Sequence, residues 1–366
     1  MSTRYHPKAW GVWLLAALTP AVLTKNPLYL LIIILAAGLN YFSLGQTSPT
    51  GQRWGVFLRL GLILVLFSTI FNLLSVSAGD TPLFTLPTLR WTGMSSSQQP
   101  VVIQIGGVVT LESLVHGLAN GLGLMAMLII FATFNTLVDH YQLLRSTPRF
   151  LYQSALVVSI AITFVPQMVV AQREIREAQA LRGHRFRGIR DLPPLFIALL
   201  TEGLERSIAL AESMDARGFG GQSVEHTARQ ELLFKCIIAL ALVVLTSGAF
   251  ALSYFPDKTI GRVTMLAGGF MLVATLWMIG QSVQRSRYRR DRWQRRDTLV
   301  ALASLIPALV ILTVWTTQRM ALVFYPFPQL HWPAFNPFIG LSLLFIAMPA
   351  LAGRLTGEVP YDNRTD

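Results

Sequence analysis

Long apolar segments constrain the fold of this chain more than any other feature of its sequence. A helix needs about 20 mostly apolar residues to cross a bilayer, and a helix satisfies its own backbone polar groups inside hydrocarbon. The chain is 53% hydrophobic and only 13% charged, whereas soluble domains carry about 25% charged residues. We therefore predict an all-α polytopic membrane protein with about eight transmembrane helices and a cytoplasmic region of amphipathic helices. The eight predicted spans are Trp10–Thr24, Leu28–Leu44, Val56–Val76, Leu114–Phe134, Leu232–Phe255, Val263–Ser282, Leu299–Thr316 and Phe338–Ala352.

The positions of lysine and arginine predict the orientation of these spans. The formal net charge is +12. In a membrane protein such an excess usually marks the cytoplasmic loops, and here apolar spans interrupt every basic run, which argues against nucleic-acid binding. Basic residues gather in Gln172–Arg229 and in Arg285–Arg296, whereas the loops at 79–110 and 317–337 carry a single arginine each. We therefore place these two loops outside and both termini in the cytoplasm.

A ninth apolar run, Phe150–Val170, is predicted not to cross the membrane. Arg145 and Arg149 precede it, and Arg173 and Arg176 follow it. A crossing would put one of these basic flanks outside, against the usual distribution of positive charge. We interpret the run as a tilted helix that dips into the membrane from the cytoplasm or is buried against other helices.

The outer loop at 79–110 contains two stretches with the composition of strands, "LFTLPTLRW" and "VVIQIGGVV". A small extracellular hairpin and an irregular loop remain alternatives. Glu112 and His116 follow this loop, with Glu112 expected just before the next span. We expect both near the headgroups or the outer loop, or alternatively lining a polar cavity.

Aromatic and basic residues near the predicted span ends indicate the membrane surface. The run Arg285–Arg296 is expected to contact anionic headgroups or, alternatively, a partner protein. Tryptophans near span ends are typical of an interfacial belt; those here are Trp10, Trp13, Trp54, Trp91, Trp293, Trp315 and Trp332.

The polar middle of the chain predicts an amphipathic helix after Asp191. Asp can cap a helix, and the prolines that follow are tolerated in its first turn. Apolar residues then recur every three or four positions from Leu192 onward, opposite a charged face. The helix is predicted to end where Gly218 follows Arg217, because glycine past a helix end forms the left-handed cap and Arg suits the helix dipole.

An earlier helix, which runs out of Phe150–Val170, ends in the same way at Arg182 and Gly183. A single Arg-Gly is an ordinary helix end. Two of them in one cytoplasmic region suggest that each helix end inserts, like a plug, into a groove on another protein. The planar guanidinium suits interfacial carboxylates, and the small neighbours Ala180 and Ala216 allow close backbone approach. Two plugs would suit two similar partners or the two halves of a dimer.

With these two motifs, the chain resembles the transmembrane T component of energy-coupling factor transporters, the EcfT/CbiQ family, whose signature is two Ala-Arg-Gly motifs that end coupling helices. Ala216-Arg217-Gly218 matches fully, whereas Leu181 replaces the alanine of the first motif. The stretches "TKNPLYLL", "TLESLVHGLANGLGLMAMLIIFATFNTLVDHYQLL" and "FVPQMVVAQREIREAQALRG" are also similar to the family, so that the resemblance covers roughly Pro7–Phe255.

The resemblance implies a prokaryotic cell-membrane protein that links two ATP-binding-cassette ATPases to a membrane S component for vitamin or transition-metal uptake. It implies that Ala180, Arg182, Gly183, Ala216, Arg217 and Gly218 couple to the ATPases. The domains expected are 1–135 with the first spans, 136–230 with the coupling helices, and 231–366 with the last spans. The part after residue 255 has no assignment.

Residues for catalysis or for a cofactor are not apparent. The sequence has no G-x-x-x-x-G-K-[ST] loop, so we expect ATP hydrolysis on separate subunits. The six histidines show no ligand spacing for a metal. We therefore expect a non-catalytic chain without cofactor or metal. A self-contained secondary transporter or channel is the alternative function; it would need ionisable residues in mid-span. A membrane-embedded enzyme would need a convergent polar cluster.

Overall fold

The computed structural model describes residues 5–44, 54–76, 78–94, 100–138, 143–144, 147, 151–183, 192–218, 228–254, 258–282 and 293–355. The chain divides into two compact units, which we call the first unit (residues 1–143 and 291–366) and the second unit (residues 144–290). Each is described by itself.

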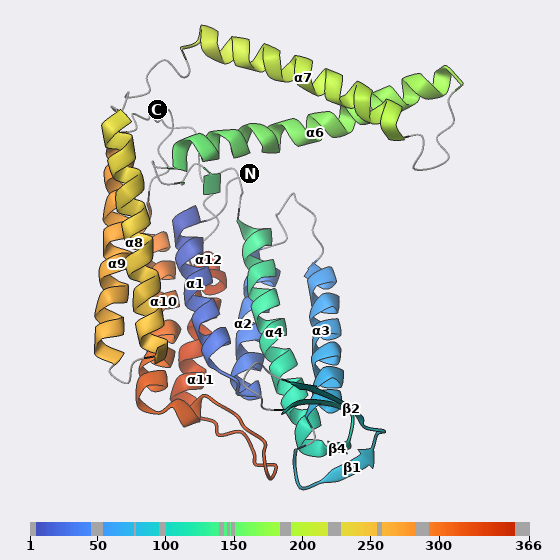
Figure 1. Ribbon diagram of the computed structural model, residues 1–366, viewed down its shortest axis with the longest axis vertical. Coiled ribbons are helices and arrows are strands. Elements are labelled where there is room, and N and C mark those ends of the chain that lie inside the picture. The colour runs from blue at the N-terminus through green and yellow to red at the C-terminus, as the bar shows by residue number, and fades with distance from the viewer. Residues whose placement is uncertain are drawn as a thin grey trace. The chain divides into compact units, whose positions relative to one another are not determined.

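The first unit is a helical bundle with a small β hairpin at one end of α3 and α4 (Figure 1). Apolar helices α2 and α4 pack against each other, α1 packs against α10 and α4, and α3 packs along α4. Glycines of α4 allow α3 to lie close to α4, because a Cβ on Gly121 would lie only 2.7 Å from the Val65 Cα of α3. The helices are α1 (Pro7–Leu23), α2 (Pro27–Leu44), α3 (Trp54–Ser75), α4 (Leu111–Leu137), α10 (Arg295–Thr317), α11 (Pro337–Leu344) and α12 (Met348–Leu355), with short 3-10 turns η4 (Arg319–Ala321) and η5 (Phe345–Ala347).

The loop between α3 and α4 forms a hairpin, which decides between the two alternatives that the sequence left open. Strand β1 (Pro82–Thr85) pairs antiparallel with β4 (Val108–Thr110). Between these two strands in the sequence, β2 (Leu89–Met94) pairs antiparallel with β3 (Pro100–Ile105) to form a second two-stranded sheet. Strand β4 leads directly into α4, so the hairpin is anchored to the bundle through the start of this helix.

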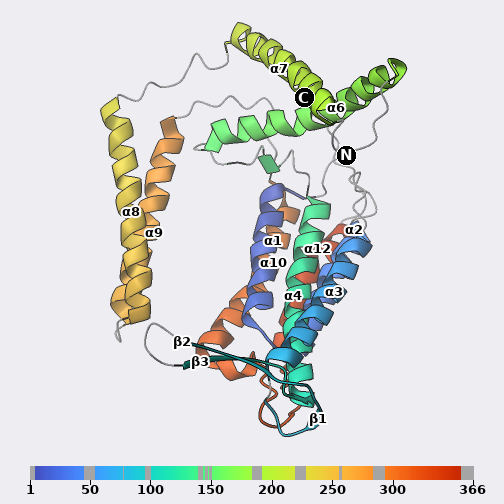
Figure 2. The same cartoon turned by 45° about the vertical axis from the view of Figure 1, so that its right-hand side comes forward.

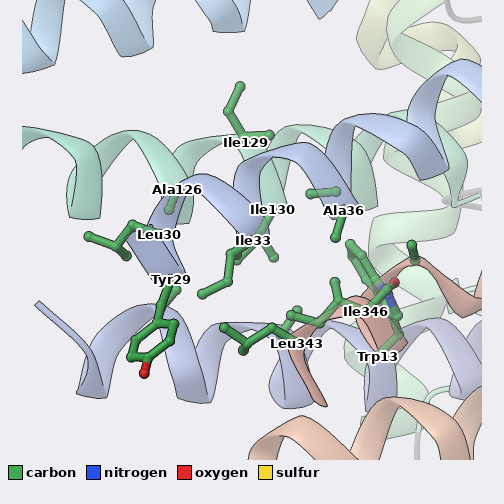
Figure 3. Close-up of a cluster of buried hydrophobic side chains, with 14 of the residues drawn as sticks. Trp13, Tyr29, Leu30, Ile33, Ala36, Ala126, Ile129, Ile130, Leu343 and Ile346 are labelled. Atoms are coloured by element: carbon green, nitrogen blue, oxygen red, sulfur yellow. The ribbon is translucent and has the colours of Figure 1, made fainter. Parts of the chain in front are cut away.

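The core of the first unit joins helices from both ends of the chain. Figure 3 shows Trp13 of α1, side chains of α2 and α4, and Leu343 and Ile346 of the C-terminal helices in one cluster. Helices α10 to α12 thus complete the core of α1, α2 and α4, and this places much of the chain after residue 255 with its beginning.

Two tryptophans expected in the interfacial belt lie in this core instead. Trp13 is fully buried and Trp10 is almost fully buried. The indole Nε1 of Trp13 donates to the carbonyl oxygen of Ile346 at 2.8 Å. Because α1 is covered by the C-terminal helices, its tryptophans have a protein partner in place of the headgroups.

The second unit consists of two helix pairs. The pair formed by α6 (Tyr152–Leu181) and α7 (Leu192–Ala216) crosses, as Figures 1 and 2 show. The other pair, α8 (Ala228–Tyr254) and α9 (Lys258–Ser282), is a close antiparallel hairpin. Glycine allows this closeness, because a Cβ on Gly248 would lie 2.6 Å from the Met265 backbone nitrogen.

Most predicted spans correspond to helices. Among the described residues, seven helices are long and apolar enough to cross a membrane, within α2, α3, α4, α6, α8, α9 and α10. Pro7–Leu23 and Pro337–Ala352 are shorter apolar segments. An all-α polytopic membrane protein is therefore confirmed. The stretch within α6, Ser154–Leu181, has the length and apolar character of a span, and its predicted failure to cross stays a prediction.

Candidate functional site

Helix α7 ends as its sequence predicts. The backbone N–H of Arg217 donates to the Met214 carbonyl at 3.1 Å, and that of Gly218 donates to the Asp215 carbonyl at 2.8 Å. Gly218 has a φ of +75°, the left-handed conformation that reverses the chain after a helix. A Cβ on Gly218 would meet nothing within 4 Å. Glycine is therefore required here for its backbone conformation rather than for space.

Helix α6 ends with the same construction. The Arg182 N–H donates to the Ala178 carbonyl at 3.3 Å, and the Gly183 N–H donates to the Ala180 carbonyl at 3.0 Å. Gly183 has a φ of +85° and open space around its Cα. Both glycines end the helix immediately after an arginine, so the guanidinium lies at the tip of a rigid element. The Asp191 cap predicted for α7 lies outside the described residues.

The six predicted site residues are all exposed, but they form two separate groups. Ala180, Arg182 and Gly183 end α6, whereas Ala216, Arg217 and Gly218 end α7. The two helices run in opposing directions through their crossing, so these two ends lie at opposite extremities of the crossed pair (Figures 1 and 2). Arg206 and Glu202 of α7 form an exposed ion pair away from both motifs, and both motif arginines are exposed and therefore open to another molecule.

Gly203 of α7 forms part of the crossing. A Cβ at this position would lie 3.5 Å from the Met168 Sδ and 3.9 Å from the Phe164 Cε1, both on α6. Leu195 and Ala171 are buried on the two helices. These contacts turn one face of α7 toward α6. The apolar spacing of the α7 sequence gives no signal for this packing role of Gly203.

A second apolar face of α7 remains uncovered. Phe196 and Leu204 are 59% and 63% exposed, and Ile197, Leu200 and Ile208 are similarly open. A contiguous exposed apolar surface marks a protein or membrane contact. The crossed pair therefore offers two arginine tips and an apolar surface beside them.

The polar residues at the start of α4 have a structural arrangement. Glu112 lies within the first turn of α4 rather than before the helix, and its Oε1 accepts a hydrogen bond from the Thr81 hydroxyl at 2.7 Å. The carboxylate is fully buried. The His116 ring packs edge-on against Tyr325 and Phe327. Glu112 thus holds the hairpin against α4. His116 holds the loop after α10 against the same helix.

Metal-ligating groups are not clustered in the described residues, where no group of three His, Cys, Asp or Glu side chains could hold an ion. Most of the basic run Arg285–Arg296 lies outside the described residues.

Comparison with known proteins identifies relatives of the first two thirds of the chain. The family model CbiQ, described as cobalt transport protein, matches residues 2–228. This match includes both helix ends and stops short of Phe255, the expected limit of the resemblance.

Three curated relatives carry the same description, energy-coupling factor transporter transmembrane protein EcfT. The protein of Streptococcus equi subsp. equi is 26% identical over 225 residues, which is 58% of this chain and 78% of the relative. That of Streptococcus thermophilus is 29% identical over 109 residues, 28% of this chain and 41% of the relative. That of Bacillus selenitireducens is 33% identical over 85 residues, 22% of this chain and 32% of the relative. The chain thus matches less than half the length of the last two.

Proposed function

The chain belongs to the CbiQ family of cobalt transport proteins, and from that premise we propose that it is the transmembrane coupling component of an ATP-driven energy-coupling factor importer. Two separate ATP-binding-cassette ATPases hydrolyse the ATP, and a membrane S component binds the substrate, a vitamin or a transition-metal ion. The chain is a non-catalytic subunit of a prokaryotic cell membrane, with both termini in the cytoplasm. It transmits the movement of the ATPases to the S component.

The observation that carries this proposal is the pair of exposed arginine tips. Arg182 and Arg217 each end a helix immediately before a left-handed glycine, at opposite extremities of one crossed pair. A motor of two subunits that approach and separate needs one rigid attachment on each subunit. Two tips on crossed helices supply these attachments and convert the relative movement of the subunits into a change of the crossing.

The uncovered apolar face of α7 supports the same role. Its exposed leucines and phenylalanine would be buried against the ATPases, and apolar burial provides most of the driving force for association. The arginines would then fix register and orientation, because charged groups contribute specificity more than raw affinity.

The alternative, a self-contained secondary transporter or channel, would be expected to place ionisable residues in mid-span. Among the described residues, the two buried carboxylates are Glu112 and Asp297, and both lie in the first turn of a helix. Asp297 accepts hydrogen bonds from the backbone N–H groups of His6 and Gln294 at 2.7 and 2.9 Å. These contacts fasten helix starts, which favours the coupling role.

The first test removes the arginine tips. We expect Arg217→Ala to reduce ATPase co-purification strongly, because deleting one partner of a buried charge pair typically costs 2–5 kcal/mol, roughly 30-fold or more in affinity. Arg217→Lys should restore it only in part, since lysine lacks the bidentate fork. The double variant Arg182→Ala plus Arg217→Ala should abolish ATP-driven uptake of Co²⁺ and of a panel of vitamins.

Arg229→Ala is the matched control, because Arg229 is an exposed arginine at the start of α8. It should leave assembly and uptake unchanged. Leu204→Asp tests the apolar face of α7, with Ala209→Asp on an exposed position of the same helix as its control. Normal ATPase capture and normal uptake by the double arginine variant, inserted at wild-type level, would refute the coupling role.

A further inference from the structure

Strands β2 and β3 form a two-stranded ribbon whose two faces differ in chemistry. Residues paired across an antiparallel ribbon share a face, and the face alternates from one pair to the next. The register therefore puts three pairs on one face, namely Leu89 with Ile105, Trp91 with Ile103, and Gly93 with Val101. The other face carries the polar residues of the ribbon, Arg90, Thr92 and Gln104, together with Met94, Pro100 and Val102. One face is thus entirely apolar.

The apolar face of the ribbon needs a partner. An isolated two-stranded hairpin is marginally stable in water and gains stability when an apolar face packs on something else. Among the principal contacts of the described residues, β2 touches only β3, and β3 touches only β2 and the helix α3. The bundle therefore meets the ribbon at α3, and the cover for the rest of its apolar face comes from outside the bundle.

The ribbon begins at the level where a membrane span ends. The backbone N–H of Gly106, directly after β3, donates to the carbonyl of Leu74 at 2.8 Å. Leu74 lies in the last turn of α3, which is one of the helices long and apolar enough to cross a membrane. This hydrogen bond fixes the base of the ribbon at the end of the span, and hence at the surface of the bilayer.

Two glycines turn the ribbon away from the helix axes at this point. Gly106 and Gly107 have φ of +89° and +128°, a conformation that side-chain-bearing residues rarely adopt. A Cβ on Gly106 would collide with the Pro87 carbonyl oxygen, on the segment between β1 and β2. The corner separates the β1–β4 sheet from the β2–β3 sheet. Figures 1 and 2 show β2 and β3 running across the direction of α3 and α4, as a ribbon lying along a membrane surface would.

Three further features favour the membrane surface over the interior of the bilayer. Each strand has six residues, whereas a strand needs about 9–11 residues to cross. In a two-stranded sheet each strand keeps one unpaired edge, and unpaired backbone groups are not tolerated in hydrocarbon. The connection between the strands, at 95–99, has the polar sequence SSSQQ.

We propose that the β2–β3 ribbon is an interfacial membrane anchor, which lies flat on the bilayer and binds phospholipids through its apolar face. Trp91 and its partner Ile103 occupy the middle of that face, and tryptophan is enriched where headgroups meet acyl chains. The face with Arg90 stays in water. The anchor holds the adjoining ends of α3 and α4 at the membrane surface. It depends on the membrane class of the chain and not on the proposed coupling function.

The test compares two neighbouring positions on opposite faces of β3. Val102→Cys and Ile103→Cys are made separately in a Cys236→Ser background, because Cys236 is the one cysteine of the chain. Each full chain is labelled with a nitrobenzoxadiazole fluorophore and placed in phosphatidylcholine nanodiscs whose acyl chains carry a nitroxide close to the headgroup. The nitroxide should quench position 103 roughly threefold more than position 102, because an interfacial element buries its apolar side about 5–10 Å into the headgroup and acyl boundary. Iodide in the water should quench the two positions in the reverse order.

A carboxylate on each face provides the second arm. Trp91→Asp adds the charge to the apolar face, and Thr92→Asp adds the same charge to the other face. Both changes replace a strand-favouring residue by one that is depleted from strands, so a general weakening of the ribbon would affect both variants. With the label at position 103, Trp91→Asp should lower quenching by the lipid nitroxide to the level of position 102. Thr92→Asp should leave it unchanged.

The outcomes distinguish lipid from other partners of the apolar face. Protection of position 103 from both quenchers would show that the helices cover this face. Strong quenching there by iodide would show that the face is open to water, free for a protein absent from the nanodisc. Either result, or equal lipid quenching at positions 102 and 103, would overturn the anchor. An equal loss in Trp91→Asp and Thr92→Asp would overturn the assignment of the two faces. The arginine variants test the coupling function independently.

Discussion

At the residue scale, the side chain of Asn40 replaces a backbone hydrogen bond that is missing between α11 and α12. Pro349 has no backbone N–H, and the segment from α11 to α12 passes through the 3-10 turn η5. In a regular helix the Ile346 carbonyl would accept a bond from the Ala350 N–H. Instead the Asn40 Nδ2 donates to the Ile346 carbonyl at 2.8 Å, and the Asn40 Oδ1 accepts from the Ala350 N–H at 2.9 Å. The amide of α2 thus bridges the missing bond.

The corresponding prediction concerns stability. Asn40→Leu should lower the free energy of unfolding by about 1–3 kcal/mol, because it leaves the buried Ala350 N–H unpaired. Trp13→Phe should cost less, since the Ile346 carbonyl keeps its bond from Asn40. Thermal unfolding in detergent measures both changes. Trp277→Phe, at a tryptophan that is 68% exposed, is the control and should not shift the transition. A larger loss for Trp13→Phe than for Asn40→Leu would show that the bridge is not the decisive contact.

At the scale of elements, α6 combines two kinds of helix. Its first half is apolar with exposed valines, whereas its last turns carry the charges that lead to Arg182. Its 30 residues correspond to about 45 Å at 1.5 Å per residue, more than the hydrocarbon core of a bilayer. The length and composition of α6 would permit it to cross the membrane. The prediction that it does not cross therefore depends only on the basic residues at both ends of its apolar run.

Accessibility tests this prediction about α6. Cysteines at Thr147 and Gln172, in a Cys236→Ser background, flank the apolar run. We expect a membrane-impermeant maleimide to label both sites only after the cytoplasmic face is opened, because both flanks are basic. A cysteine in the hairpin, such as Leu83→Cys, should react from outside and reports the opposite side. Labelling of positions 147 and 172 from opposite faces would make α6 a span and reverse the orientation of one half of the chain.

At the scale of the whole molecule, helices from the two ends of the chain pack together in the first unit. The matched family region ends at residue 228, but α10 to α12 lie beyond it and pack with α1 and α2. Three contacts show how closely the two ends are joined. The Tyr5 hydroxyl donates to the Pro349 carbonyl at 2.8 Å, the Thr24 hydroxyl donates to the Leu322 carbonyl at 3.0 Å, and the Asn336 N–H donates to the Tyr29 hydroxyl at 2.8 Å.

Two deletions test this organisation. Removal of residues 291–366 should prevent the first unit from folding, because it exposes the core faces of α1 and α2 and unpairs their polar groups. Removal of residues 228–282 takes out the α8–α9 hairpin and keeps the direction in which α10 enters the membrane, so the first unit should remain folded. Size-exclusion profiles and melting temperatures in detergent compare the two. A monodisperse, equally stable product from the first deletion would contradict the shared core.

The sequence by itself determined the membrane class, most helix positions and both arginine tips. These features depend on local properties: apolar length, amphipathic spacing and the left-handed preference of Gly183 and Gly218, all of which act within a few residues. It also showed the difference between Leu181 and Ala216. Only the tertiary structure decided that Trp13 faces the core, that Glu112 fastens the hairpin, and that the chain after residue 291 completes the first unit. Those outcomes depend on contacts between residues about 30 to 350 positions apart, and in lipid apolar faces that pack on protein and those that face the bilayer have similar composition.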